Sequence, residues 1–153
     1  HTAASSASSE PEKWDPQTRE TADHSIPFLV AAAFQEGEVT PNSFTPQRIA
    51  DATKRDTMSK MTLSENQEFS AKFPSEYNCR ITVTDHLGNV HTAHTAYSKG
   101  HKNNPLDDKE LEGKFRSFAS GVLSDMQCED VLGTIWAIDE ATDMDDLFDG
   151  LVV

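Results

Sequence analysis

Two short stretches carry the side chains that could move protons or bind anions. Residues 19–25 bring together an arginine, two acids, a histidine and a serine. Residues 97–105 hold a tyrosine, two lysines and a histidine, and no acid. Histidine, lysine, tyrosine and arginine can remove a proton, protonate a leaving group and bind carboxylates without a metal. The sequence therefore favours acid–base chemistry on an acidic substrate.

The candidate site residues of these stretches are expected to line a substrate cavity or a domain interface, and the pattern assigns none of them as the catalytic residue. For residues 19–25 the alternative is a capped helix with a hydrogen-bonded histidine. For residues 97–105 it is a basic loop that offsets nearby acids. The candidates are Arg19, Asp23, His24, Ser25, Tyr97, Lys99, Gly100 and His101.

A predicted helix positions the first stretch. Ser25 is a favourable N-cap, Pro27 falls in the first turn, and Gly37 is placed to end the helix. Residues 26–34 are apolar on every side, so we expect this helix to be buried all round. Polar groups would then lie at the start of a buried helix, where its dipole favours an anion.

A predicted β-hairpin leads into the second stretch. Apolar and polar residues alternate over 77–85, a turn is predicted at 86–89, and the chain returns as a second strand over 90–97. A weaker alternation at 61–65 suggests a further short strand. The expected fold class is α+β, with a small, mostly antiparallel sheet, helices on one face and a ferredoxin-like arrangement.

Helix start signals surround these elements. Asp107 with Glu110 forms a predicted capping box, as does Ser124 with Gln127. Further helices are expected after Thr45, after Asp51 and from Thr142. On the helix after Asp51, Lys54 and Arg55 are expected to be solvated.

Composition narrows the function classes. The 153 residues fit one domain, and the net charge of −13 argues against nucleic-acid binding. No run approaches the ~20 apolar residues that cross a bilayer. The two cysteines, Cys79 and Cys128, lack zinc spacing and cannot hold a four-cysteine iron–sulfur cluster. We expect buried free thiols, a cytoplasmic location, no metal and no cofactor.

Several motifs in order resemble the MmgE/PrpD family. The resemblance begins with Glu12-Lys13-Trp14-Asp15-Pro16-Gln17-Thr18-Arg19 and runs into Glu20-Thr21-Ala22-Asp23-His24-Ser25. It covers nearly the whole chain and keeps the family's spacing. Its later parts are Ser43-Phe44-Thr45, Leu87-Gly88, Lys99-Gly100-His101, Asn104-Pro105-Leu106 and Leu111-Glu112-Gly113-Lys114-Phe115.

The family includes 2-methylcitrate dehydratase of propionate metabolism, aconitate decarboxylase and iminodisuccinate epimerase. The resemblance implies a cofactor-independent enzyme for a small di- or tricarboxylate. Dehydration of 2-methylcitrate is expected first, because Asp23-His24-Ser25 looks like that branch. Decarboxylation and epimerisation are alternatives, and a stand-alone, non-catalytic acidic interaction module is the alternative from another class.

The resemblance also implies a domain organisation. It places a single α+β lid-type domain at 10–153, whereas the flexible lead-in expected at 1–9 rests on the small, polar residues there. The partner would be an N-terminal helical domain, absent from this sequence, that carries the main acid–base residues and shares the cavity. The resemblance further implies a homodimer for the full-length form, and we expect the chain alone to be inactive.

Overall fold

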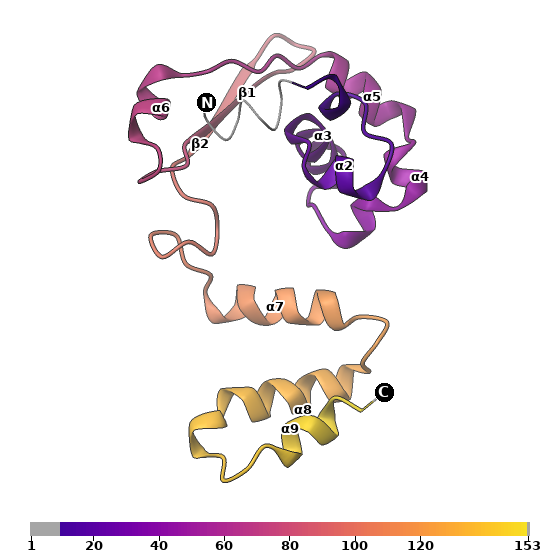
Figure 1. The fold of residues 1–153 in the computed structure, drawn as a ribbon, viewed down its shortest axis with the longest axis vertical. Helices are drawn as coiled ribbons and strands as arrows, with labels where there is room; N and C mark the ends of the chain where they lie inside the picture. The colour runs from indigo at the N-terminus through magenta and orange to yellow at the C-terminus, as the bar shows by residue number, and fades with distance from the viewer. Residues whose placement is uncertain (1–9, 153) are drawn as a thin grey trace. The chain divides into compact units, whose positions relative to one another are not determined.

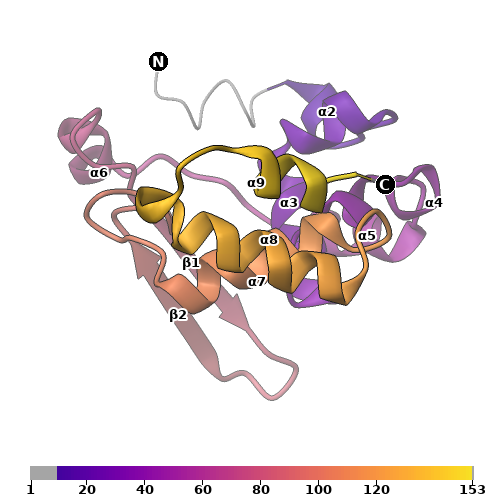
Figure 2. The same cartoon turned by 90° about the horizontal axis from the view of Figure 1, so that it is seen from below.

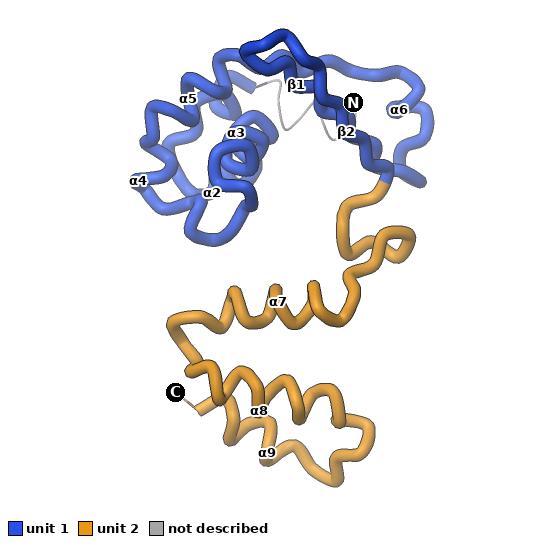
Figure 3. The backbone as a smooth tube through the Cα atoms, turned by 180° about the vertical axis from the view of Figure 1, so that it is seen from behind, with its two compact units in different colours: residues 1–96 blue, residues 97–153 orange. Residues whose placement is uncertain are grey.

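The computed structural model describes residues 10–152, which group into two compact units (Figures 1 and 3). Unit 1 ends at residue 96 and unit 2 begins at residue 97. The expected lead-in at 1–9 lies outside the described residues. Unit 1 contains η1 (Pro11–Lys13), α2 (Arg19–Asp23), α3 (Ile26–Glu36), η2 (Pro41–Phe44), α4 (Pro46–Ile49), α5 (Ala52–Ser59), α6 (Gln67–Lys72), β1 (Cys79–Thr84) and β2 (Val90–Thr95). Unit 2 contains α7 (Asp108–Ala119), α8 (Asp125–Trp136), η3 (Ile138–Glu140) and α9 (Asp145–Gly150).

Helix α3 is the centre of unit 1 and packs mainly against α5 and α2. Its predicted ends are confirmed. The Ser25 hydroxyl accepts a hydrogen bond from the Phe28 N–H at 3.1 Å, and Gly37 ends the helix with φ 82°. The helix is not buried all round, because Phe34 is 65% exposed on the side that its neighbours leave open. The buried core consists of Ala22, Phe28, Ala31, Ala32, Ile49 and Met58.

The predicted hairpin is present and confirms the α+β fold class. Strands β1 and β2 pair antiparallel, with Cys79 opposite Thr95 and Thr84 opposite Val90. Asp85 shapes the loop because its carboxylate accepts the N–H groups of Leu87 and Asn89. The hairpin is the whole sheet in the part of the chain described, and a ferredoxin-like arrangement takes more strands than this.

Two details of the expected sheet differ from the structure. Residues 61–65 form no strand, since they have no neighbouring strand to pair with. Nearly all described residues of β1 and β2 are exposed, so the helices of unit 1 leave most of the hairpin uncovered; the Phe69 ring of α6 stacks on His94. For the same reason Cys79 is exposed, whereas Cys128 is buried as expected; both are free thiols.

Unit 2 is built from helices that pack in sequence, α7 on α8 and α8 on α9 (Figure 2). The capping boxes predicted at Asp107 and Ser124 are both formed. The last helix starts later than Thr142, at Asp145; its N-cap is Met144, and the Asp143 carboxylate accepts the Asp145 N–H at 3.1 Å. Among the described helices, none has the length and apolar character needed to cross a membrane.

Candidate functional site

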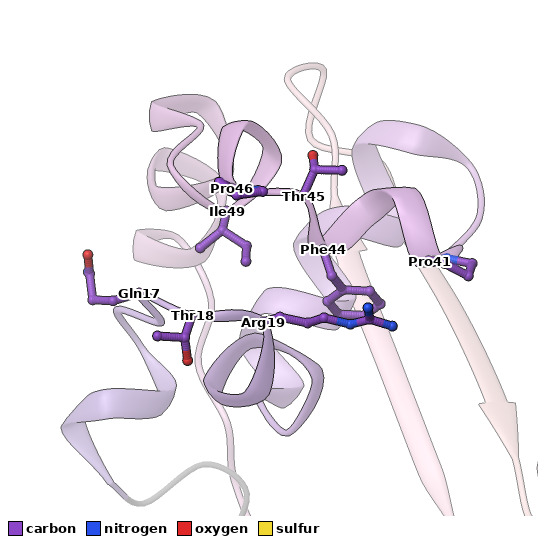
Figure 4. A pocket seen from close by; sticks show the side chains of 8 residues that line it. All are labelled: Gln17, Thr18, Arg19, Pro41, Phe44, Thr45, Pro46 and Ile49. Atoms are coloured by element: carbon purple, nitrogen blue, oxygen red, sulfur yellow. The ribbon is translucent and has the colours of Figure 1, made fainter.

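Arg19 lies at the start of α2 and lines an open cavity of about 420 Å³ in unit 1 (Figure 4). Thr18 precedes it and caps α2 by accepting the Thr21 N–H at 3.2 Å. The Arg19 side chain runs beside the Phe44 ring toward Pro41. The cavity is therefore an apolar hollow with a cation at its edge; its lining residues are Gln17, Thr18, Arg19, Pro41, Phe44, Thr45, Pro46 and Ile49.

The Arg19 guanidinium forms no ion pair with any acid in residues 10–152. Two other arginines of unit 1 are paired with acids: Arg48 faces Glu36 at 3.6 Å and Arg55 faces Asp15 at 2.8 Å. An exposed guanidinium offers several N–H donors in a geometry that matches a carboxylate. Arg19 can therefore bind an anion without first breaking an ion pair.

His24 follows α2 and is held by two acceptors. Its Nδ1 lies 2.5 Å from Asp23 Oδ1 and 3.1 Å from the Glu20 carbonyl oxygen. Because a carbonyl can only accept, Nδ1 carries the hydrogen and Nε2 is left to take up or donate a proton. The side chain is 73% exposed, so the oriented imidazole is open to a partner or ligand. Asp23 and His24 thus form an oriented acid–base pair outside the Arg19 cavity.

The pKa of His24 is expected to lie above its ordinary value of 6.5. The hydrogen bond to the Asp23 carboxylate is the main cause, followed by the bond to the Glu20 carbonyl and the negative charge of Asp23. An NMR titration should show this raised midpoint, and Asp23→Asn should lower it. Asp56→Asn, a matched change on α5, should leave the midpoint in place. Equal effects of both substitutions would contradict the role of Asp23.

Ser25 is fully buried and its hydroxyl is occupied within the protein. It donates to the Lys13 carbonyl and accepts from the Phe28 N–H. This joins η1 to the start of α3. Ser25 is therefore a structural cap, as the alternative reading of residues 19–25 predicted, and does not offer its hydroxyl to a ligand.

Ser25→Ala should lower the free energy of unfolding of unit 1 by about 1–2 kcal/mol, because it removes a cap and leaves buried backbone groups unpaired. The chain has two tryptophans, Trp14 in unit 1 and Trp136 in unit 2. Urea unfolding in a Trp136→Phe background, followed by Trp14 fluorescence, isolates unit 1. Ser59→Ala, at an exposed serine of α5, is the control and should cost less than ~0.5 kcal/mol.

The second stretch forms an ordered loop in unit 2. The rings of Tyr97 and His101 stack with centroids 4.7 Å apart. Gly100 has φ 92°, and its N–H donates to the Asn104 carbonyl at 2.8 Å. Lys99 pairs with Glu110 at 2.8 Å, and this bond is the main cause of the lowered pKa of Glu110. For Lys99 the structure thus shows the basic loop offsetting a nearby acid.

The eight candidates are divided between the two units. Arg19, Asp23, His24 and Ser25 belong to unit 1, and Tyr97, Lys99, Gly100 and His101 to unit 2. Of the first group only Arg19 lines the described cavity. Whether the candidates share one substrate cavity stays a prediction. The residues 10–152 hold no cluster of three or more metal-ligating side chains.

The expectation that Lys54 is solvated is wrong. Its side chain is completely buried, and its ammonium binds Glu36, whose second oxygen accepts the Ser43 hydroxyl at 2.7 Å. Burial alone would raise the pKa of Glu36, but the bonds from Lys54 and Ser43 outweigh it and lower the pKa. Lys54 precedes the buried Met58 by four residues, so the two share one face of the helix, and this spacing could have revealed the burial of Lys54.

Sequence reasoning also missed most of the cavity wall. Phe44, Thr45 and Ile49 come from η2 and α4, whose helix start at Thr45–Pro46 was predicted. What was not predicted is that these elements face the start of α2. One feature of the sequence could have indicated this packing. Phe44 and Ile49 are apolar residues on either side of a capped helix start, and both had to be covered by another element.

The comparisons with known proteins match this chain to one family. The family model of the MmgE/PrpD C-terminal domain matches residues 1–138. Cis-aconitate decarboxylase of Mus musculus is 27% identical over 132 residues, which cover 86% of this chain and 26% of that protein. Cis-aconitate decarboxylase of Homo sapiens is 32% identical over 109 residues, covering 71% and 22%. This chain spans about a quarter of the length of these curated relatives. Since the family model covers most of its residues, the chain belongs to the MmgE/PrpD family and carries the family's C-terminal domain.

Proposed function

We propose that this chain is the C-terminal, lid-type domain of a metal-independent lyase that acts on a small di- or tricarboxylate. The observation that carries the proposal is the match of residues 1–138 to the MmgE/PrpD C-terminal domain. The site agrees with it in chemistry: Arg19 is an unpaired cation in a cavity, and His24 is an oriented imidazole. Both belong to the residue types that bind carboxylates and move protons.

Two reactions are candidates. Decarboxylation of cis-aconitate is favoured by the names of the mouse and human relatives. Dehydration of 2-methylcitrate, a reaction of propionate metabolism, is favoured by the Asp23-His24-Ser25 motif. Ser25 is a structural cap in this chain, so the motif's chemistry rests on Asp23 and His24 alone. We therefore place decarboxylation first and dehydration second.

Each reaction would use this chain's residues in the same way. Arg19 would bind a carboxylate and hold the substrate against the apolar wall of its cavity. His24, oriented by Asp23, would pass a proton at Nε2 to or from a group brought by a partner domain. The remaining acid–base residues, a helical partner domain, a homodimer and a cytoplasmic location are parts of the same proposal.

The test is an assay of the longer protein encoded by the gene, with cis-aconitate and 2-methylcitrate in parallel. Release of CO₂ from the first measures decarboxylation, and loss of water from the second measures dehydration. We expect turnover of one acid by the longer protein and of neither by the 153-residue chain. Turnover by this chain alone would overturn the lid assignment, and failure of the longer protein on both acids would overturn the lyase.

A cheaper observation separates the lyase from the acidic interaction module. The coding sequence upstream of the His1 codon should encode a helical domain with histidine, lysine and aspartate residues. A start codon immediately before this position would favour the module.

A further inference from the structure

Helix α7 packs on α8 through a polar side. The Glu112 carboxylate of α7 accepts the Trp136 indole N–H of α8 at 2.9 Å. Four residues later on α7, Arg116 forms an ion pair with Glu129 of α8. Residues four apart share one side of a helix, so this side of α7 faces α8. The partner on α8 moves back along the chain as α7 moves forward, and the two neighbouring helices are therefore antiparallel (Figures 1 and 2).

The large apolar residues of α7 lie on another side of the helix. Leu111, Phe115 and Phe118 follow one another at intervals of four and three residues, which makes one stripe along the helix. Leu111 is 47% exposed and Phe118 is 59% exposed. The contact with α8 thus leaves the stripe uncovered, although a stripe of this kind is normally buried against another element.

Ile135 extends the stripe onto α8. Phe118 follows Glu112 by six residues, and Ile135 follows Glu129 by six residues. Six residues make about 1.7 turns of a helix, so Phe118 and Ile135 are rotated away from the α7–α8 contact by the same angle. In antiparallel helices that face each other, equal rotations lead to the same side of the pair. Ile135 is 41% exposed. We call these residues the α7–α8 apolar face: Leu111, Phe115, Phe118 and Ile135.

The segment that holds α8 and α9 carries negative charge that few cations offset. Residues 117–153 contain nine acids and no lysine, arginine or histidine. Within residues 10–152, Glu129 is the one acid of this segment that forms an ion pair. Exposed apolar side chains beside an excess of negative charge are complementary to a partner that is apolar and basic.

The same charge distinguishes the possible occupants of the face. A second copy of this chain would bring another nine acids toward the first nine, and an anionic lipid surface would also be repelled. A helix with apolar residues on one side and lysines or arginines beside them would fit both features. Its apolar side packs along the exposed stripe, and its cations lie near the acids of 117–153.

We infer that the α7–α8 apolar face binds a basic amphipathic helix of another protein. The apolar side of that helix packs on Leu111, Phe118 and Ile135, and its basic residues face the acids of 117–153. The inference rests on unit 2 alone and is independent of the lyase activity proposed above.

The test is an NMR titration of the 153-residue chain, labelled at its isoleucine, leucine and methionine methyl groups, with a synthetic peptide. A peptide of about 18 residues is long enough to form a helix, and it carries leucines on one side and lysines on the other. We expect saturable methyl shifts at Leu111 and Ile135 and none at Met126. Met126 lies nine residues before Ile135 and therefore on the opposite side of α8.

Two twin peptides separate the contributions of charge and of amphipathic order. One has glutamate in place of each lysine, and the other has the same composition in shuffled order. Each should bind at least about tenfold more weakly than the basic peptide. Equal binding of the three peptides would overturn the inference, and so would methyl shifts at Met126 as large as those at Ile135.

Phe118→Ser should weaken binding of the basic peptide about tenfold, because it removes the large aromatic anchor of the face. Met126→Ser is the matched control, since Met126 is 75% exposed on the other side of α8, and it should leave the affinity unchanged. Both side chains are mostly exposed, so the amide spectra should show an unchanged fold. Equal losses in the two variants would indicate non-specific apolar attraction and overturn the inference.

Two further measurements address the other occupants. The longer protein encoded by the gene should bind the basic peptide as tightly as this chain does. Loss of binding in the longer protein would mean that its own residues cover the face. Sedimentation of this chain alone should reveal no dimer that Phe118→Ser dissociates, because such a dimer would make a second copy the occupant. Either result would overturn the inference.

Discussion

Replacing Lys54 by methionine is expected to lower the free energy of unfolding of unit 1 by about 3–5 kcal/mol. Lys54 is completely buried on α5 and its ammonium binds Glu36 on α3. Methionine keeps much of the aliphatic side chain but removes the charge, so Glu36 would lose the partner that offsets its desolvation. Urea unfolding of the Trp136→Phe background, followed by Trp14 fluorescence, measures the change.

The expected loss of stability is large because few other groups can pair with the Glu36 carboxylate. Its side chain is only 15% exposed, so water reaches it poorly. Ser43 donates one hydrogen bond at 2.7 Å, and Arg48 approaches to 3.6 Å from an exposed position. Arg48 could move closer in the variant, which places the expected loss toward the lower end of the range.

Lys60→Met, at the C-cap of the same helix, is the matched control. Lys60 pairs with Asp56 at 2.6 Å, but both side chains are well exposed. An exposed pair contributes little, so the loss should stay below ~1 kcal/mol. If Lys54→Met and Lys60→Met destabilise unit 1 equally, the buried ion pair is not what holds α3 to α5.

Acid should reduce the advantage of the parent chain over Lys54→Met. In the folded parent, the pKa of Glu36 lies below its ordinary value of 4.5. The carboxylate therefore stabilises the folded state above the unfolded pKa, and this stabilisation is lost as the pH falls through the folded value. Urea midpoints of the two proteins should converge from neutral pH to below 4.5. A gap that widens on acidification would contradict the lowered pKa.

The helix starts could be predicted because the interactions that make them are local. Ser25, Asp107 and Ser124 each accept an N–H three residues ahead, so the side chain and its target lie in one short window of sequence. The hairpin was predicted for a similar reason, since alternation and a turn at Asp85–Asn89 specify it together.

Burial could not be predicted in the same way, because it depends on what another element covers. Lys54 is buried by a partner 18 residues away on α3, and a lysine read by itself is expected in solvent. Cys79 shows the opposite case. Strand alternation predicted a buried inner face for it, but the Cys79 side chain is exposed.

The candidate site shows the same difference between local interactions, which could be predicted, and contacts with distant elements, which could not. The residue types of the candidate site indicated carboxylate binding and proton transfer, and its motif identified Arg19 as a candidate. The cavity that Arg19 lines could not be predicted, because its wall comes from η2 and α4, more than twenty residues later in the chain. Ser25 and Lys99 were named from motifs as well, and their hydroxyl and ammonium are bound within the protein.

Phe28→Ala is the second substitution with a large expected effect, a loss of about 3–5 kcal/mol from the free energy of unfolding of unit 1. Phe28 is 1% exposed at the centre of the core. The centroid of its ring lies 5.9 Å from the centroid of the Phe44 ring and 5.7 Å from the Lys54 ammonium nitrogen. Removing it leaves a cavity between α3, η2 and α5. The Trp14 unfolding transition measures the loss.

Phe34→Ala supplies the control, with the same change on the same helix. Phe34 is 65% exposed, so its removal creates no buried void and should cost much less than the Phe28 substitution. The ring contact of Phe28 also supports Phe44, which lines the Arg19 cavity. Equal stability losses in the two variants would mean that the core does not centre on the Phe28 face of α3.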